Sequence, residues 1–235
     1  MPKIHLKTSN PVSLKLRKNH HYTMDKVQET FNEWATNGRS ELMEKEHQKN
    51  VEKFLSKISF ERPFSFLDIG CGNGWTVRKI ASLDNCKKAV GIDKSNKMIK
   101  NAKSKSRSKK EHFIATDLES WKYQGRFDYI FAMESIYYSR LVQDAVNKAY
   151  RLLKKEGWFF CGTDFYKDNK ATSRWSNMMN IPMHLLSKSQ WREIFNQAGF
   201  KTKTIHVKDP KNTKKWKREF GTLFIMGEKT LDDLS

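Results

Sequence analysis

Three glycines at alternate positions form a loop suited to close approach by a ligand. Gly70, Gly72 and Gly74 follow an apolar run, Phe64–Ile69, and precede an amphipathic stretch. Glycine lacks a Cβ atom and tolerates positive φ, so the order strand, glycine loop and helix lets bare backbone reach a bound molecule. The spacing differs from the G-x-G-x-x-G loop of dinucleotide sites and from the phosphate-binding loop of nucleotide triphosphatases. It favours a nucleoside-type cofactor and argues against a nicotinamide dehydrogenase.

Two carboxylates are spaced to bind other parts of such a ligand. Asp68 lies two residues before Gly70, where its carboxylate can reach the mouth of the loop. Asp93 ends a second apolar run, residues 88–92. In a βαβ unit an acid about 20 residues beyond the glycines can accept both hydroxyls of a ribose. The same residue could instead cap the following helix, and the sequence leaves both roles open.

The glycine loop and the second acid belong to a longer ordered series of motifs. Residues 68–74 read Asp-Ile-Gly-Cys-Gly-Asn-Gly, and residues 91–93 read Gly-Ile-Asp. They resemble the first two motifs of class I S-adenosylmethionine-dependent methyltransferases. Segments similar to the third and fourth strands of that family follow at residues 111–117 and 127–134, and then a helix and turn at 144–157 and a fifth strand at 158–165. The resemblance covers residues 64–229 and implies S-adenosyl-L-methionine as the cofactor.

The resemblance also implies a fold. It is a Rossmann-like α/β fold with a seven-stranded, mostly parallel sheet, whose last strand is antiparallel between the fifth and sixth, plus an N-terminal helical cap. Strand and helix patterns alternate from residue 64 to 165, which by itself indicates a parallel sheet. Further elements are expected as a turn at 152–157, a serine-capped helix at 187–199, and closing strands at 200–207 and 220–227.

The chain divides by composition into three parts. Residues 1–22 are basic and polar and are expected to form a flexible arm. Residues 23–60 are expected to form the helical cap, as two helices separated near Asn37 and Gly38. Residues 61–235 would form the methyltransferase domain, with an acceptor-side insertion at 166–186.

The family resemblance assigns roles on the cofactor side. Asp68 would lie near the ammonium group of the cofactor, Asp93 would hold the ribose, and Asp117 would face the adenine amine with Leu118 beside it. The complete set of candidate cofactor-binding residues is Asp68, Gly70, Cys71, Gly72, Gly74, Asp93, Lys94, Asp117, Leu118, Met133, Trp34 and Arg39.

The sequence is less specific about the residues that would surround the methyl acceptor. Methyl transfer from a sulfonium mainly requires alignment and exclusion of water, so no metal is expected, and a base helps only an acceptor that holds a proton. Glu134, Tyr137, Tyr138 and His184 are the catalytic candidates. The segment after the fourth strand lacks Asn/Asp-Pro-Pro and is similar to the small-molecule branch of quinone, sterol and glycine-type enzymes. The alternative for these side chains is plain packing or helix-end stabilisation.

The strong positive charge supports a second reading. Lys and Arg outnumber Asp and Glu by 45 to 26, a formal net charge of +19. Lysines gather at residues 3–18, 94–110 and 208–218. The last two segments could track the phosphates of RNA, with Trp216 between cations to stack on a base. Solvated lysine faces explain the same pattern, and a small-molecule acceptor remains the first hypothesis.

Other features limit the location and the class of protein. The three cysteines are scattered and form no CxxC pair, which favours a reducing cytoplasm over a disulfide or zinc framework. No apolar run approaches the length of a membrane span. The sequence leaves open a monomer or a homodimer, the identity of the acceptor, and a cofactor-binding module without turnover.

Overall fold

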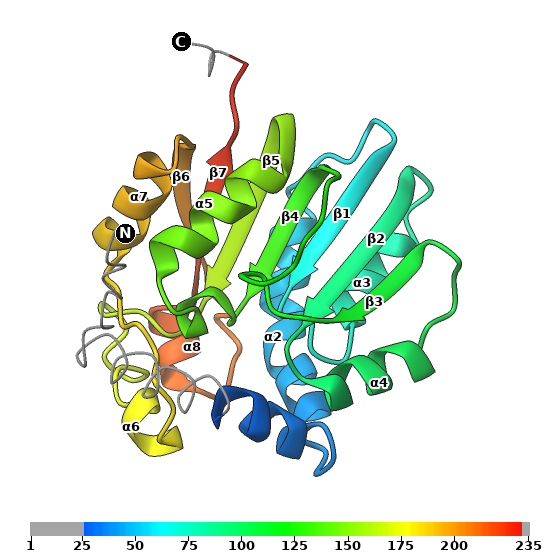
Figure 1. Ribbon diagram of the computed structural model, residues 1–235. Coiled ribbons are helices and arrows are strands. Elements are labelled where there is room, and N and C mark those ends of the chain that lie inside the picture. Colours follow the sequence, from blue (N-terminus) through cyan, green and yellow to red (C-terminus); the bar gives the residue numbers. More distant parts are fainter. Residues whose placement is uncertain (1–25, 232–235) are drawn as a thin grey trace, which may run out of the picture.

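A seven-stranded sheet with helices on both faces forms the centre of the computed structural model, which describes residues 26–231 (Figure 1). The strand order is β3-β2-β1-β4-β5-β7-β6, and β7 is antiparallel to both neighbours. The strands are β1 (Phe64–Ile69), β2 (Cys86–Asp93), β3 (Glu111–Ala115), β4 (Phe127–Met133), β5 (Leu153–Thr163), β6 (Lys201–Val207) and β7 (Thr222–Glu228). The expected sheet, including the position of its antiparallel strand, is confirmed.

The chain reverses its direction of travel across the sheet between β1 and β4. From β1 it moves to β2 and β3 at one edge, and from β4 it moves to β5 on the other side. Ligands of open α/β sheets bind outside the carboxyl ends of the strands at such a switch point. The fold therefore directs attention to the loops that follow β1 and β4.

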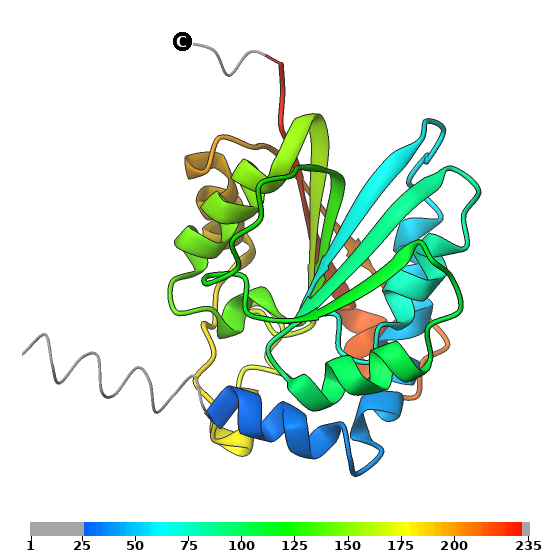
Figure 2. The ribbon, with the colours of Figure 1, turned by 45° about the vertical axis from the view of Figure 1, so that its right-hand side comes forward.

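Helices cover the two faces of the sheet and bury two apolar layers. In Figures 1 and 2, α5 and α7 lie on one face, and α2 and α3 lie on the other. The helices are α2 (Arg39–Leu55), α3 (Trp75–Ala81), α4 (Asn96–Ser104), α5 (Val142–Leu152), α6 (Trp175–Met179), α7 (Lys188–Gln197) and α8 (Lys215–Glu219), with a single 3-10 turn, η1 (Ile136–Tyr138). None of the helices within residues 26–231 is long and apolar enough to cross a bilayer.

Alternation along each strand divides the side chains between these layers. On β1, Leu67 and Ile69 join the layer under α5 and α7, whereas Phe64 and Phe66 join the layer under α2 and α3. Phe54 of α2 enters the second layer and stacks on Phe224 at a ring separation of 4.0 Å. Because both faces are covered, the central strands are apolar almost throughout.

The first helix of the described chain and the first half of α2 lie over the carboxyl ends of the strands. Residues 26–34 are helical, and Gly38 (φ 81°) separates them from α2, as the sequence predicts. The Asn32 side chain accepts a hydrogen bond from Ser95 Oγ (2.7 Å), which fixes the first helix to the start of α4. Figure 1 shows this helix, in dark blue, below the strand arrowheads. The predicted arm at residues 1–22 lies outside the described residues.

Two expectations about the second half of the chain have different outcomes. Ser187 caps α7 and forms a reciprocal capping box with Gln190, which confirms the serine-capped helix. The turn expected at 152–157 is instead the start of β5, with an irregular register opposite β4. Glu156 adopts φ 60° there, and its N–H pairs with the Lys229 carbonyl (2.8 Å). Pairing beyond the end of β7 keeps this segment in the sheet.

Candidate functional site

An acidic side chain lies at or just after the carboxyl end of each of the five parallel strands. These residues are Asp68, Asp93, Asp117, Glu134 and Asp164. The carboxyl ends of parallel strands meet at one edge of a sheet, so the acids gather around the switch point. Two cavities open there, and the lining residues that they share are Met43, Gly70, Gly72, Met98, Met133 and Glu134. The larger has a volume of about 840 Å³ including its open mouth, within the usual range for ligand pockets.

The glycine loop shapes the floor of the cleft. A Cβ atom on Gly70 would lie 2.4 Å from Ser135 Cβ, so this position needs glycine for packing. Gly72 has φ 52°, and a Cβ there would meet nothing within 4 Å. Its N–H donates to Asp93 Oδ2 (2.9 Å). The backbone of Gly72 therefore borders open space in the cleft, where a ligand can approach it closely.

The larger cavity is bordered on one side by Asp93, Asp117 and Leu118. Asp93 accepts hydrogen bonds from Gly72 N–H and Ser95 N–H (2.9 and 2.8 Å), but burial still raises its pKa. The pKa of Asp117 shifts in the opposite direction. Burial raises its pKa, yet bonds from the N–H and Oγ of Ser120 (both 2.7 Å) outweigh that effect and lower it. Asp117 thus remains ionised at neutral pH.

The smaller cavity is bordered by Asp68, Asn73 and Trp75 from β1 and the glycine loop, and by His47 from α2. Asp68 is buried, and burial together with the neighbouring Asp93 raises its pKa well above the usual range. Asn73 Nδ2 donates to Glu44 Oε2 (2.7 Å), which ties the loop to α2. The cap is therefore part of the cavity wall.

Glu134 lies where the two cavities meet, in a strained conformation. Its φ of 52° is uncommon for a residue with a side chain, and such strain concentrates at functional sites. Tyr137 Oη donates to Glu134 Oε2 (2.5 Å), and the Asp164 N–H donates to the other carboxyl oxygen. Burial, followed by repulsion from Asp164, raises the pKa of Glu134 to about 7. Glu134 can therefore exchange a proton near neutral pH.

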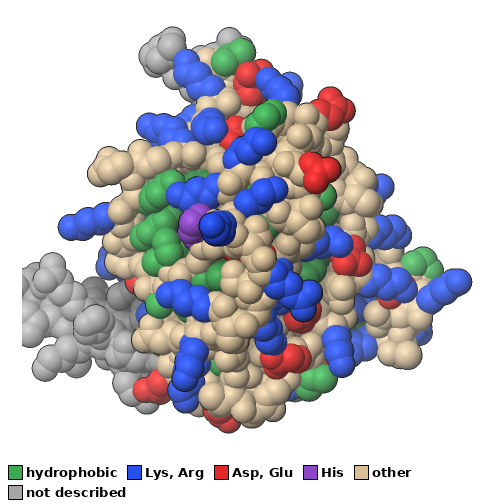
Figure 3. Space-filling model, turned by 90° about the vertical axis from the view of Figure 1, so that its right-hand side faces the viewer, with side chains coloured by type: hydrophobic (Ala, Val, Ile, Leu, Met, Phe, Trp, Pro, Cys, Tyr) green, Lys and Arg blue, Asp and Glu red, His purple; other side chains and the backbone are tan. Residues whose placement is uncertain are grey.

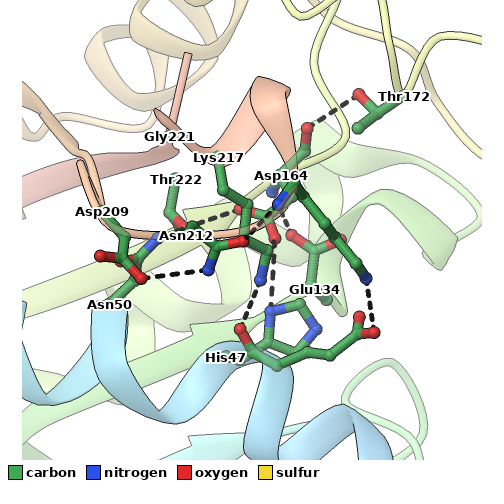
Figure 4. A network of polar contacts seen from close by, with 12 residues as sticks. His47, Asn50, Glu134, Asp164, Thr172, Asp209, Asn212, Lys217, Gly221 and Thr222 are labelled. Atoms are coloured by element: carbon green, nitrogen blue, oxygen red, sulfur yellow. Dashed lines mark hydrogen bonds and ion pairs between the residues drawn. The ribbon is translucent and has the colours of Figure 1, made fainter. Parts of the chain in front are cut away.

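Asp164 is the centre of a buried polar network behind Glu134 (Figure 4). Thr222 Oγ1 donates to Asp164 Oδ1 (2.6 Å), and the Lys217 Nζ and His47 Nδ1 atoms lie 3.7 and 3.4 Å from Oδ2. Burial opposes ionisation of Asp164, but His47, Lys217 and Thr222 together lower its pKa. The network holds one carboxylate ionised next to a carboxyl group, Glu134, that is readily protonated.

Aromatic side chains border the larger cavity beside Glu134. Tyr138 contacts the Tyr137 ring at 4.5 Å, and Phe31 packs edge-on against Tyr138 at 5.4 Å. Val27 and Ile136 complete this apolar wall. A molecule held against this wall would contact aromatic and aliphatic side chains with the Glu134 carboxyl group beside them.

Comparison with known proteins identifies the fold family. A family model described as a methyltransferase domain matches residues 61–199, which is more than half of the chain. The chain belongs to this methyltransferase domain family. Its motif order and its sheet are those of the class I enzymes that use S-adenosyl-L-methionine, as the sequence predicts. The open space over Gly72 and the acids around it fit that cofactor.

Several known proteins are similar to this methyltransferase. The ubiquinone biosynthesis O-methyltransferase of Pelagibacter ubique is 31% identical over 121 residues, 49% of each chain. The matches to this and two other curated relatives span 28–49% of the relatives' own lengths. A Haloferax volcanii protein, solved in complex with the Trm112 methyltransferase activator, superposes with a TM-score of 0.80 at 24% identity, covering 85% of this chain and 97% of that one. NodS of Bradyrhizobium japonicum, an N-methyltransferase bound to S-adenosyl-L-homocysteine, gives 0.66 at 18%, covering 87% and 98%.

Most of the residues proposed from sequence meet in the two cavities. The lining residues among them are Asp68, Gly70, Cys71, Gly72, Asp93, Lys94, Asp117, Leu118, Met133, Glu134 and Tyr138. Gly74 instead begins α3, where a Cβ would lie 2.5 Å from the Phe113 ring. Tyr137 is buried behind Glu134. The glycine loop therefore combines a ligand-facing glycine with glycines needed for packing.

Three proposed residues and one proposed segment lie away from these cavities. Trp34 and Arg39 stack on each other, with Arg39 Cζ 4.7 Å from the centre of the indole ring, and neither lines a cavity. The side chain of His184 is exposed, and its backbone N–H donates to the Tyr137 carbonyl (3.0 Å). No residue of the 166–186 insertion lines either cavity.

Site residues that were not among the predicted binding or catalytic residues come mostly from the cap and from the end of β5. Phe31, Met43 and His47 line the cavities from the two N-terminal helices, and Asp164 organises the buried network. Asp164 carries a signal similar to that of the acids that were found, because it lies near the end of the predicted fifth strand. The cap residues carry no such signal, since a helix packed across the cleft cannot be aligned to it by spacing alone.

Proposed function

We propose that this methyltransferase transfers the methyl group of S-adenosyl-L-methionine to a small-molecule acceptor. The observation that carries the proposal is the apolar wall of Phe31 and Tyr138 beside Glu134, beneath the helix of residues 26–34. Such a covered, apolar space suits a molecule that enters whole. The Pelagibacter ubique relative, named for ubiquinone biosynthesis, supports a small acceptor.

On the cofactor side, the positions of the side chains suggest one role each. Asp93 would accept the ribose hydroxyls with the lone pairs that its bonds from the Gly72 and Ser95 N–H groups leave available. Asp117 and Leu118 border the adenine, and Asp68 lies on the side of the ammonium group. The cofactor supplies an electrophilic methyl group whose C–S bond breaks with the electron pair remaining on sulfur. The protein holds the acceptor in line with that bond and excludes water.

An RNA acceptor has weaker support. Lys97, Lys100 and Lys103 on α4 are exposed and could contact phosphates. The 208–218 segment is less suitable, because Lys217 is 2% exposed and Trp216 packs against Trp175 at 5.7 Å. The base-stacking role considered for Trp216 would require that pair to separate.

A partner protein of the Trm112 kind is a further part of the proposal. The Haloferax volcanii neighbour was solved with such an activator. Within residues 26–231 of this chain, one side of β3 pairs with no strand, and a partner strand could extend the sheet there. Figure 3 shows hydrophobic side chains and a histidine on this face among lysines and arginines. This face contains a hollow next to β3, and the residues that line it include His112, Ile114, Trp121 and Tyr123. The opposite edge, β6, presents exposed Lys201 and Lys203, which discourage pairing.

Copurification tests the activator. A tagged Trm112-type protein should retain this methyltransferase, and Ile114→Lys should abolish retention because it places a charge in the hollow. Thr202→Lys on the β6 edge is the matched control and should leave retention intact. If the tagged protein retained both variants equally, the activator would not bind at β3.

Transfer of a labelled methyl group tests the acceptor class. The protein is incubated with methyl-labelled S-adenosyl-L-methionine and cell extract, and the RNA, protein and small organic fractions are separated. Label in the organic fraction supports the proposal, and label in RNA alone contradicts it. Asp93→Ala should transfer little label, whereas the matched control Asp84→Ala, an exposed acid outside the cleft, should behave like the original chain.

A further inference from the structure

His47 has no role in the cofactor site, yet it faces that site from the middle of α2. Its side chain is 12% exposed and lines the cavity shared with Asp68, Gly72 and Glu134. Figure 4 shows the imidazole next to Asp164, with Glu134 close by. A half-buried imidazole in a cleft wall is positioned to exchange a proton with a molecule in that cleft.

The two buried atoms that face each other lack hydrogen bonds. Within the described residues, neither His47 Nδ1 nor Asp164 Oδ2 has a hydrogen-bond partner, and they lie 3.4 Å apart. Buried polar atoms are almost always paired, and hydrogen bonds at catalytic sites are often long without ligand and shorten when it binds. One proton on Nδ1 satisfies both atoms. It leaves Nε2 bare and able to accept a proton.

A buried carboxylate lies directly beside the imidazole. Asp164 lies at the end of β5 and stays ionised, since its pKa is lowered. Glu134, which directly follows β4, accepts a hydrogen bond from Tyr137 of η1. Lys217 of α8 faces the same Asp164 oxygen as His47 does. Glu44 and Asp68 border the cavity from α2 and β1. The Asp164 carboxylate is therefore the group placed to balance a positive charge on the imidazole.

We propose that His47 is the general base that removes the proton of the acceptor, and that Asp164 is the residue that positions it. This inference rests on the proposed function and narrows the acceptor to one whose reacting oxygen or nitrogen holds a proton at neutral pH. That atom forms its bond to the methyl carbon, and its proton passes to His47 Nε2. The resulting imidazolium is balanced by the Asp164 carboxylate.

Which ring nitrogen of His47 carries the proton can be measured without methyl transfer, and this position tests the inference. Nitrogen-15 NMR of the imidazoles in the full chain, with S-adenosyl-L-homocysteine added, assigns His47 by its loss in His47→Gln. We expect the proton on Nδ1 in the original chain and a mixture of tautomers in Asp164→Asn. A proton fixed on Nε2 in the original chain overturns the inference.

Methyl transfer into the small organic fraction of a cell extract gives the second readout. His47→Gln should lower the transfer rate by about 100-fold or more at pH 7, with partial recovery as the pH rises and the acceptor loses its own proton. Affinity for S-adenosyl-L-homocysteine, measured by calorimetry, should change by less than about threefold, since His47 contributes to the reaction and not to this binding. His206→Gln, an exposed histidine on β6, is the matched control.

The outcomes separate this inference from the proposed function. Undiminished transfer by His47→Gln, or a tenfold or greater loss of affinity, overturns the role of His47 alone. If the original chain binds the cofactor but labels no organic molecule, the proposed function fails, and the NMR readout still decides the position of the proton. Asp164→Glu should restore part of the rate lost in Asp164→Asn, because a carboxylate is again within reach of Nδ1.

Discussion

The two ends of the cleft are built differently. Where Asp93 and Asp117 lie, each acid is held by hydrogen bonds from its own loop or from the adjoining glycine loop, over 2.7–2.9 Å. At the Glu134 end, the groups come from α2, β4, β5, α8 and β7, and the closest contacts to Asp164 range from 2.6 to 3.7 Å. Local contacts fix the first end, whereas the tertiary fold assembles the second.

This difference should appear as different responses to mutation. Substitutions at the Asp93 end should change ligand affinity and leave the fold almost unaffected. Substitutions at the Glu134 end should also change stability, because buried charges there depend on one another. The following predictions test this contrast from the largest expected effect to the smallest.

Lys217→Met should destabilise the protein by about 3–5 kcal/mol, because it leaves the buried Asp164 without its ammonium partner. Denaturant unfolding measures the loss. Lys215→Met is the matched control on the same helix, with a side chain 77% exposed, and should change stability by less than about 0.5 kcal/mol. Equal stability of the two variants would mean that the buried network contributes little to folding.

Gly72→Asn should weaken binding of S-adenosyl-L-methionine on the order of 100-fold or more, because its side chain enters space where backbone and ligand must meet. Asparagine tolerates positive φ, so the fold should survive. Gly38→Asn has a similar conformation (φ 81°) and open surroundings away from the cleft. Calorimetric affinities of the two variants that agree would refute the ligand-facing role of Gly72.

Stability should fall as pH rises from 4.5 to about 7, because the pKa of Glu134 rises from its ordinary 4.5 to about 7. Below 4.5 the group is protonated in both states. Above pH 4.5 this glutamate ionises first in the unfolded chain, which lowers the free energy of unfolding by on the order of 2–3 kcal/mol. Asp164 has a lowered pKa, so its contribution to stability increases as pH rises, in a lower pH range. Glu134→Gln should flatten the fall between pH 4.5 and 7 in denaturant titrations, and an unchanged slope would contradict this origin.

Asp93→Ala should weaken cofactor affinity by about 1.5–3 kcal/mol, since it removes a charged acceptor for hydroxyl groups. Stability should change little relative to Asp84→Ala, because Asp93 is half-buried and bonded only to neighbouring backbone N–H groups. Calorimetry and unfolding of both variants provide the comparison. A large loss of stability with intact affinity would reverse the contrast between the two ends.

The same contrast explains how far sequence reasoning reached. The alternation of strands and helices and the Ser187 cap follow from periodicity and capping chemistry, which are local properties, whereas the antiparallel β7 was implied by the family resemblance of the ordered motifs. Asp68 and Asp93 could be located because fixed spacing relates each to the glycines. The contact of His47 with Asp164 joins residues 117 positions apart through the packing of a helix on a sheet. No periodicity in either segment records that contact.

His184 illustrates the same limit. Its sequence position after the fourth and fifth strands made it a reasonable acceptor-side base, but the insertion turns its side chain to solvent. Trp34 and Arg39 likewise pair with each other outside the cavities, and Phe31, one turn earlier in the helix, lines the cleft. In each case residue type was informative, and the direction of the side chain depended on tertiary packing.

The acids at the strand ends also give the cleft a built-in preference between the two forms of the cofactor. Burial raises the pKa of Asp68, Asp93 and Glu134, so each of these groups ionises less readily than it would in water. A sulfonium cation placed beside them would favour their ionised forms, and we expect its binding to become stronger as pH rises. The thioether left after transfer would lack that positive charge and would gain less from the ionised acids. We therefore expect alkaline conditions to favour exchange of spent cofactor for fresh cofactor.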